Sequence, residues 1–244
     1  MKGFVFYEGA SLIDGAPIVG IATLESDNRK TGAMVQTWIM RSDVAPADAV
    51  RSGLDSSVCG DCALRGSADP TGRRDWPTGR ICYVDVYRAP TAIFNAYLRG
   101  AYPRIDPLDP AARDQLIGRK LRMGAYGDPA AIDTLLWFQL IEYCDGWTGY
   151  TAQWRKAYAQ GLRELCMASV QSEREHAAAI MLGWRTYAVI GSAAPVPTGR
   201  ALCPTPIRQC IDCMACDGAL RPSAASMVIR VHGSGRKAFD GAFA

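Results

Sequence analysis

The chain has 244 residues, of which 49% are hydrophobic and 21% are charged, so it lacks the composition of a disordered protein and is long enough to bury its own core. Its net charge of +3 indicates neither a nucleic-acid partner nor the absence of one. No apolar stretch approaches the roughly 20 residues of a membrane span, and residues 1–8 lack the apolar run of an export signal. We therefore expect a cytoplasmic protein without membrane contact.

The first half of the chain predicts short strands and helices around a polar loop. Pro46 at a first helical position indicates a helix, and the loop that follows is rich in Gly, Asp, Ser, Arg and Pro, so a hydrophobic core does not organise it. In chain order we expect strands at 3–7, 18–23 and 34–40, a helix at 46–53, the loop at 55–80, a strand at 81–86, a helix at 91–99 and a linker at 103–110.

The second half predicts strand–loop–helix units in succession. Asp128 and Ser172 are expected N-caps, and Ser172 forms a capping box with Glu175. Such units build parallel strands, in an open doubly wound sheet or in a complete or partial (β/α) barrel, and we favour the barrel. The expected strands are 121–125, 147–151, 165–170 and 184–190, and the expected helices begin near 129, 152 and 172.

The predicted fold is thus a single α/β domain over residues 1–244, with Cys-rich insertions at about 55–85 and 201–222. Both architectures place chemistry in the loops that follow the carboxyl ends of the strands. Nine cysteines in a reducing compartment are better interpreted as metal ligands or redox groups than as disulfides. The cysteines are therefore the most informative feature of the sequence.

The second insertion holds the densest cysteine motif. Cys210, Cys213 and Cys216 form C-x2-C-x2-C, and Cys203 lies upstream in a Cys-Pro pair. This pattern is typical of iron–sulfur ligands, but four thiolates equally make a closed tetrahedral zinc site with a structural role. The spacing leaves iron–sulfur and zinc open as alternatives.

The first insertion offers three thiols, from Cys59, Cys62 and Cys82. A three-thiolate site either takes a fourth ligand from elsewhere or keeps an open position, which is what substrate chemistry at a metal needs. Of the two histidines, His232 is the better candidate for a fourth ligand and His176 is expected to be an ordinary helical residue. The remaining cysteines are expected to be buried apolar side chains: Cys144 and Cys166.

The order of these parts is itself a pattern. A Cys-rich loop ending in Cys82-Tyr83 is followed by a helix, by a strand closing in a Gly-Asp turn, by Gly149-Tyr150-Thr151, and by Ala168-Ser169-Val170 before a capped helix. Over residues 59–190 this order resembles the radical-SAM-like proteins encoded by phages and prophages. The segments Cys-Gly-Asp-Cys and Gly-Ala-Tyr-Gly-Asp-Pro also resemble uncharacterised phage or plasmid proteins, a likeness that carries no function.

In the radical-SAM family three cysteines hold a [4Fe–4S] cluster whose fourth iron binds S-adenosylmethionine. The resemblance implies that Cys59, Cys62 and Cys82 are these ligands. On this interpretation Cys203, Cys210, Cys213 and Cys216 hold a second centre. The family's usual C-x3-C-x2-C spacing is replaced here by C-x2-C, nineteen intervening residues and then the third cysteine. The expected cofactor-binding residues are Gly124, Tyr126, Gly127 and Asp128, joined by two residues at a strand end, Tyr150 and Gln153.

The alternative interpretation is a zinc-stabilised, non-enzymatic module of a mobile element that binds nucleic acid or protein. Arginines around the cysteine loops would then contact phosphate. They are Arg65, Arg73, Arg74, Arg80, Arg208 and Arg221. The basic segment at 28–32 is expected to be a solvated loop, because it lacks P-loop spacing.

Overall fold

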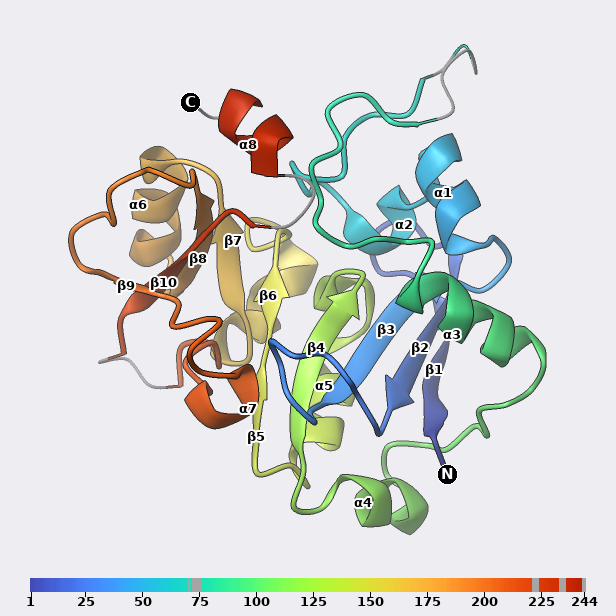
Figure 1. Cartoon of the computed structure of the whole chain (residues 1–244). Helices are drawn as coiled ribbons and strands as arrows, with labels where there is room; N and C mark the ends of the chain where they lie inside the picture. Colours follow the sequence, from blue (N-terminus) through green and yellow to red (C-terminus); the bar gives the residue numbers. More distant parts are fainter. Residues whose placement is uncertain (70, 72–75, 221–223, 233–235, 243–244) are drawn as a thin grey trace.

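The computed structural model describes residues 1–69, 71, 76–220, 224–232 and 236–242. They form a mixed α/β structure with two sheets that are rich in parallel pairs (Figure 1). The first sheet has the order β1-β2-β3-β4-β5 and the second the order β6-β7-β8-β10-β9. The predicted α/β class and parallel pairing are confirmed at this level.

The first sheet begins as an antiparallel meander and continues as a parallel sheet, because β2 pairs antiparallel with β1 and β3, whereas β4 pairs parallel with β3 and β5. All pairs of the second sheet are parallel. The strands are β1 (Gly3–Ala10), β2 (Pro17–Thr23), β3 (Val35–Arg41), β4 (Lys120–Tyr126), β5 (Gly146–Thr148), β6 (Tyr150–Thr151), β7 (Met167–Val170), β8 (Thr186–Ile190), β9 (Arg200–Leu202) and β10 (Ser226–Arg230).

Gly149 separates β5 from β6, so the predicted strand at 147–151 takes part in both sheets. The Gly149 N–H donates to the Cys216 carbonyl at 2.9 Å, and the Gly149 carbonyl accepts from the Met167 N–H at 2.9 Å. A Cβ on Gly149 would lie 2.6 Å from Cys166 Sγ. Glycine is therefore required where the two sheets meet.

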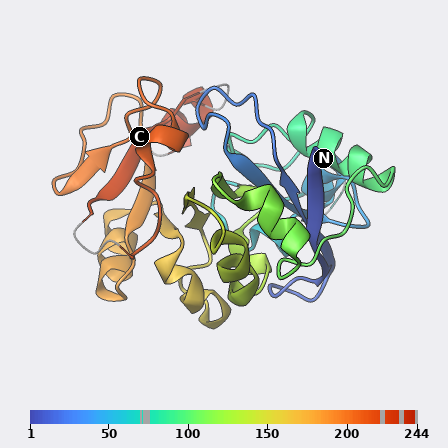
Figure 2. The same cartoon turned by 90° about the horizontal axis from the view of Figure 1, so that it is seen from below.

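The helices between residues 110 and 181 cover one side of the strands, whereas the helices at 46–52 and 89–98 and the cysteine-bearing segment after β9 lie on the other. In Figure 2 the green and yellow helices lie below the strands, whereas the orange helix and the blue loop before β3 lie above them. The helical elements are α1 (Pro46–Ser52), α2 (Ser56–Cys59), α3 (Ala89–Leu98), α4 (Pro110–Leu116), η1 (Pro129–Ala131), α5 (Thr134–Ile141), η2 (Ala157–Glu164), α6 (Glu173–Met181), α7 (Cys210–Cys213) and α8 (Arg236–Ala242).

The largest hydrophobic cluster runs continuously under both sheets. It includes Leu121 and Met123 of β4, and also Trp137, Trp154 and Trp184, all of which are buried. A second cluster packs α1 and α3 against the other face of the first sheet. The alternation of β4 therefore sends Leu121 and Met123 into the large core and turns Arg122 to the opposite face.

Three predicted elements were wrong. Residues 81–86 form no strand, since the Cys82 N–H donates to the Leu64 carbonyl of the same loop at 2.9 Å rather than to a strand edge. The single helix expected from 129 is divided, because Ile132 is extended and Asp133 caps a new helix by accepting from the Leu135 N–H. The helix expected at 152–160 is displaced to η2 (Ala157–Glu164), a 3₁₀ helix.

None of the helices in the described part of the chain combines the length and the apolar character that a membrane crossing needs. The capping prediction at Ser172 is confirmed, because its hydroxyl accepts from the Glu175 N–H at 3.2 Å. The reciprocal half of the capping box is shifted by one residue. The Glu175 carboxylate accepts from the Gln171 N–H at 2.6 Å.

Replacing Trp137 with Ala is expected to lower the free energy of unfolding by about 3–5 kcal/mol, because it empties buried volume. It also leaves the Pro129 carbonyl without its indole donor. Leu135→Ala, at an exposed position of the same helix, is the matched control and should cost less than about 0.5 kcal/mol. Urea unfolding of both variants makes the comparison, and equal losses would contradict the assigned core.

Two candidate cysteine centres

Cys59, Cys62 and Cys82 lie together and are called the first cysteine centre. Cys59 ends the short helix α2, Cys62 follows the turn at Gly60, and the 64–82 hydrogen bond brings Cys82 back to this turn. Burial raises the pKa of Cys59, and nearby charges on Asp55, Cys62 and Cys82 raise it further. The three thiols, predicted from separate parts of the loop, are thus electrostatic neighbours.

Backbone amides point at one of these sulfurs. The N–H groups of Leu64 and Arg65 hydrogen-bond to Cys62 and favour its thiolate. Burial outweighs them and raises the pKa of Cys62 to about 11. Without a metal ion this thiol is therefore protonated at neutral pH, and a metal would bind by displacing the proton.

Residues after the carboxyl end of β4 border the first cysteine centre. Burial and then the charge of Cys59 raise the pKa of Tyr126, whose hydroxyl is therefore close to that thiol. The Asp128 N–H donates to the Val58 carbonyl at 2.6 Å, and Gln153 Nε2 donates to the Cys59 carbonyl at 3.1 Å. Three of the predicted cofactor-binding residues, Tyr126, Asp128 and Gln153, are thereby brought to the three cysteines.

Asp128 has a structural role that its sequence position already indicated. One carboxylate oxygen accepts from the Ala130 N–H at 3.0 Å and caps η1, and the other accepts from the Ala152 N–H at 2.7 Å. Burial raises the pKa of Asp128 to about 6, although these hydrogen bonds and those from Thr151 and Gln153 lower it. The carboxylate thus joins the turn after β4 to the segment after β6.

The predicted glycines serve the turn itself. Gly124 and Gly127 have φ of 65° and 81°. A Cβ on Gly124 would lie 2.6 Å from the Gly127 carbonyl oxygen, and one on Gly127 would lie 2.4 Å from the Ile39 carbonyl oxygen. Their place near the cysteines is therefore fixed by backbone packing, whatever ligand the site takes.

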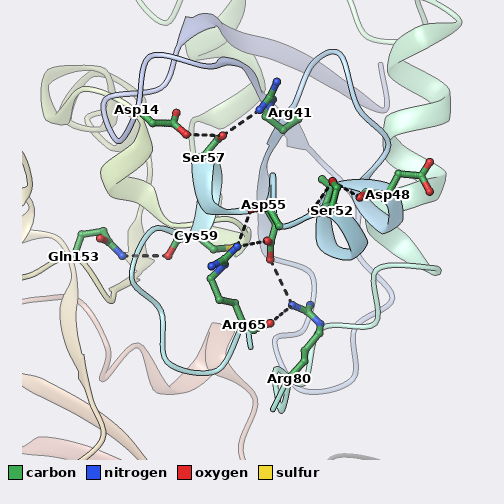
Figure 3. A network of polar contacts seen from close by, with 12 residues as sticks. Asp14, Arg41, Asp48, Ser52, Asp55, Ser57, Cys59, Arg65, Arg80 and Gln153 are labelled. Atoms are coloured by element: carbon green, nitrogen blue, oxygen red, sulfur yellow. Dashed lines mark hydrogen bonds and ion pairs between the residues drawn. The ribbon is translucent and has the colours of Figure 1, made fainter. Parts of the chain in front are cut away.

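A buried ionic network holds the loop that carries the first cysteine centre (Figure 3). Asp55 is 2% exposed and accepts from Arg65 Nη2 at 2.6 Å, and its other oxygen lies 3.7 Å from Arg80 Nη1. Arg65 also donates to the Gly53 carbonyl at 2.8 Å. Because this loop has no apolar core to stabilise it, the ionic network stabilises it instead.

Cys203, Cys210, Cys213 and Cys216 form the second cysteine centre. Burial, together with charges on the three other thiols, raises the pKa of Cys216 to about 12, although a hydrogen bond with Tyr150 lowers it. The charges of Cys203 and Cys213 similarly raise the pKa of Cys210, and the charge of Cys213 raises the pKa of Cys203. All four thiols predicted to share a metal are therefore mutual neighbours.

Local structure explains how the second cysteine centre gathers. Cys210 and Cys213 begin and end α7, and Met214 then turns the chain in a left-handed conformation with φ of 50°. Cys203 follows β9 and donates its N–H to the Val228 carbonyl of β10 at 2.7 Å. Cys216 packs in a small apolar cluster with Met167 and Met227, and Cys203 borders the same cluster.

Tyr150 belongs to the second cysteine centre rather than to the first. Its hydroxyl hydrogen-bonds to the Cys216 thiol, and its ring lies 4.4 Å from that of Tyr187, measured between centroids. The prediction grouped Tyr150 with Gln153 at one strand end, but Tyr150 lies within β6, whereas Gln153 follows β6 and its Nε2 donates to the Cys59 carbonyl. The next residue after Gln153, Trp154, is a core residue whose indole donates to the Ser169 carbonyl at 3.1 Å.

No group of three or more Cys, His, Asp and Glu side chains in the described ranges is already arranged to hold a metal ion. The thiols of each centre act on one another electrostatically without forming such a group. The donor sets nevertheless fit soft metals, because thiolates select zinc and iron–sulfur clusters. Neither histidine joins them, since His176 hydrogen-bonds to Thr186 at 2.7 Å and His232 to Lys30 at 2.9 Å.

The remaining predicted residues have ordinary structural positions. Cys166 is buried in the core, and the Cys144 thiol donates to the Leu140 carbonyl at 3.4 Å. Arg65 and Arg80 are engaged with Asp55, and Arg208 contacts the Asp212 carbonyl. Arg73, Arg74 and Arg221 lie outside the described residues.

The sequence analysis missed a set of polar residues beside the second cysteine centre. Arg122 Nη2 donates to the Tyr83 hydroxyl at 2.7 Å, and the Tyr83 ring lies 6.2 Å from the His232 ring, measured between centroids. His232 in turn contacts Lys30. An arginine alternating with apolar residues in a predicted strand was the one signal that could have drawn attention to this set.

Comparisons with known protein families, with curated proteins and with solved structures give no match to this chain. The resemblance to radical-SAM-like proteins therefore stays a prediction.

Asp55→Asn is expected to lower the free energy of unfolding by about 3 kcal/mol, because it leaves the buried Arg80 without its counter-charge. The control is Asp48→Asn. It breaks an exposed ion pair with Arg51 within α1 and should cost less than about 0.5 kcal/mol. Urea unfolding measures both. A loss at Asp55 no larger than at Asp48 would show that the network does not hold the loop.

Proposed function

We propose that this chain is a metalloprotein with two cysteine-ligated centres, of the iron–sulfur type expected for a radical-SAM-like protein. The first cysteine centre would hold a [4Fe–4S] cluster through three thiolates, and the second would hold its metal through four. The observation that carries the proposal is the separation of seven cysteines into two groups whose members are electrostatic neighbours.

The difference between the two centres supports an enzyme of this type. Three thiolates leave one position of a metal centre for a substrate or cofactor, whereas four thiolates close it. The first cysteine centre also lies against residues that follow the carboxyl end of β4, the position at which parallel α/β folds place their chemistry. The bound cluster would supply the redox chemistry, and the chain supplies orientation and a dry environment.

S-adenosylmethionine is the expected cofactor, and a partial (β/α) barrel is the expected architecture. The parallel strands from β3 to β5 and from β6 to β9, which follow one another through Gly149, support such an arrangement. Tyr126, Asp128 and Gln153 would border the cofactor. Asp128 already accepts two backbone hydrogen bonds, so its part is to hold the turn.

Zinc is the second candidate, and the second cysteine centre favours it. Its four thiols include Cys216, which is 7% exposed, and no open position would remain on a tetrahedral ion. In that case the centre is structural and the chain is a zinc-stabilised module. The nucleic-acid form of this alternative loses support, because Arg65 and Arg80 are engaged with Asp55 and are not available to phosphate.

The test is metal and acid-labile sulfide analysis on the full chain, prepared anaerobically from cells supplied with iron and zinc. We expect iron and sulfide together with absorption near 400 nm, roughly where iron–sulfur proteins absorb. Cys62→Ser should remove the metal of the first cysteine centre only, and Cys213→Ser that of the second only. Cys144→Ser, in a thiol outside both centres, is the control and should change nothing.

The outcomes separate the candidates. Zinc without sulfide in the unsubstituted chain would overturn the iron–sulfur proposal and support the zinc-stabilised module. Neither metal in the unsubstituted chain would overturn both. Equal metal loss in the Cys144→Ser control would show that metal content follows general folding rather than the two centres.

A further inference from the structure

Two cations beside the second cysteine centre form no ion pair with a carboxylate among the residues that the structure describes. Lys30 is in the loop between β2 and β3, and Arg122 is on β4. We propose that these two side chains are the counter-charges of a negatively charged metal–thiolate centre and set how tightly it holds its metal. This inference rests on the proposed function, and it assigns a task to residues that the cysteine pattern does not include.

The loop that carries Lys30 docks directly on the second cysteine centre. The Cys210 N–H donates to the Lys30 carbonyl at 2.9 Å, and the Ile211 N–H donates to the Thr31 carbonyl at 3.0 Å. In Figure 1 this blue loop crosses in front of β4 towards α7, and Figure 2 shows the two side by side. The backbone of the loop is therefore fixed to the cysteine segment itself.

The face of β4 that carries Lys120 and Arg122 points to α7. Lys120 Nζ donates to the Ile211 carbonyl at 2.8 Å, within the C-x2-C turn. Arg122 is two positions further along the strand and so shares the face of Lys120. Arg122 lies within electrostatic reach of Cys210, as Lys30 does of Cys203.

Neither cation has an anionic partner in the described part of the chain. Arg122 Nη2 donates to the Tyr83 hydroxyl, and its buried Nε has no hydrogen-bond partner among the described residues. Lys30 Nζ contacts His232 Nδ1 at 2.9 Å, and burial and then the charge of Arg122 lower the pKa of Lys30. The two like charges thus disfavour each other. Lys30 is exposed, so the cost of a buried cation without a partner falls on Arg122, whose Nε is buried.

A metal centre would supply the missing charge. A divalent ion held by four thiolates keeps a net charge of about −2, which two cations balance. With protonated thiols and no metal, Lys30 and Arg122 are uncompensated. Their charges therefore favour the metal-bound, fully deprotonated state of the second cysteine centre over the metal-free state.

The test is a Zn²⁺ titration of the reduced full chain against a chromophoric chelator. It is repeated in Cys62→Ser, so that the ion bound by the second cysteine centre is counted separately. Arg122→Met and Lys30→Met are each expected to lower its affinity for Zn²⁺ about 10–100-fold, the usual effect of removing an outer partner. Arg122→Lys, which keeps the charge, should retain most of the affinity. Lys156→Met, at an exposed position paired with Asp61, should change nothing.

Unfolding of the metal-free chain distinguishes a counter-charge from a structural contact. Arg122→Met should leave the metal-free chain at least as stable as the unsubstituted one, because an unbalanced buried cation is removed. A less stable metal-free variant, or equal loss of Zn²⁺ affinity in Arg122→Lys, would overturn the inference. Unchanged affinity in both Met variants would also overturn it while leaving the proposed function intact, whereas no Zn²⁺ at the second centre of the unsubstituted chain would overturn both.

Discussion

The close backbone approach at Gly149 is the constraint on which the arrangement of the two sheets and the second cysteine centre depends. Its N–H and carbonyl bind Cys216 and Met167, so one residue continues the strand pairing and anchors the cysteine segment. Any side chain there would meet Cys166 Sγ and Met123. A larger residue would push β6 away from β7 and break the hydrogen bond that holds the Cys216 carbonyl.

The two cysteine centres are held by different physical means. The first lies in a loop with little apolar packing of its own, and Asp55 with two arginines fixes that loop through buried charge. The second is bordered by tyrosines and methionines, and Lys30 and Arg122 lie beside it without an ion pair to a carboxylate of the described residues. With a metal bound, a centre of three thiols would keep an open position and suit a reacting site. A centre of four thiols with balanced charge would suit a structural or electron-transfer site.

Much of the fold could be predicted, because strand and cap signals are local. The strands at 18–23 and 121–125 are confirmed, and so are the caps at Asp128 and Ser172. The strand at 81–86 was wrong because alternating Val residues indicate a strand only where a neighbouring strand edge is present. In this loop the backbone bonds instead to Leu64.

The sequence by itself determined the chemistry of the donors: seven cysteines in two spaced groups, and an Asp-Pro pair that caps a turn beside one of them. Spacing along the chain fixes which thiols of one turn can meet, so these groups could be read directly. Only the tertiary structure decided that Cys82 returns to Cys62, that Tyr150 faces Cys216, and that Lys30 and Arg122 lie beside the second centre. Such contacts join segments distant in the chain through strand pairing and loop docking, and no local pattern encodes them.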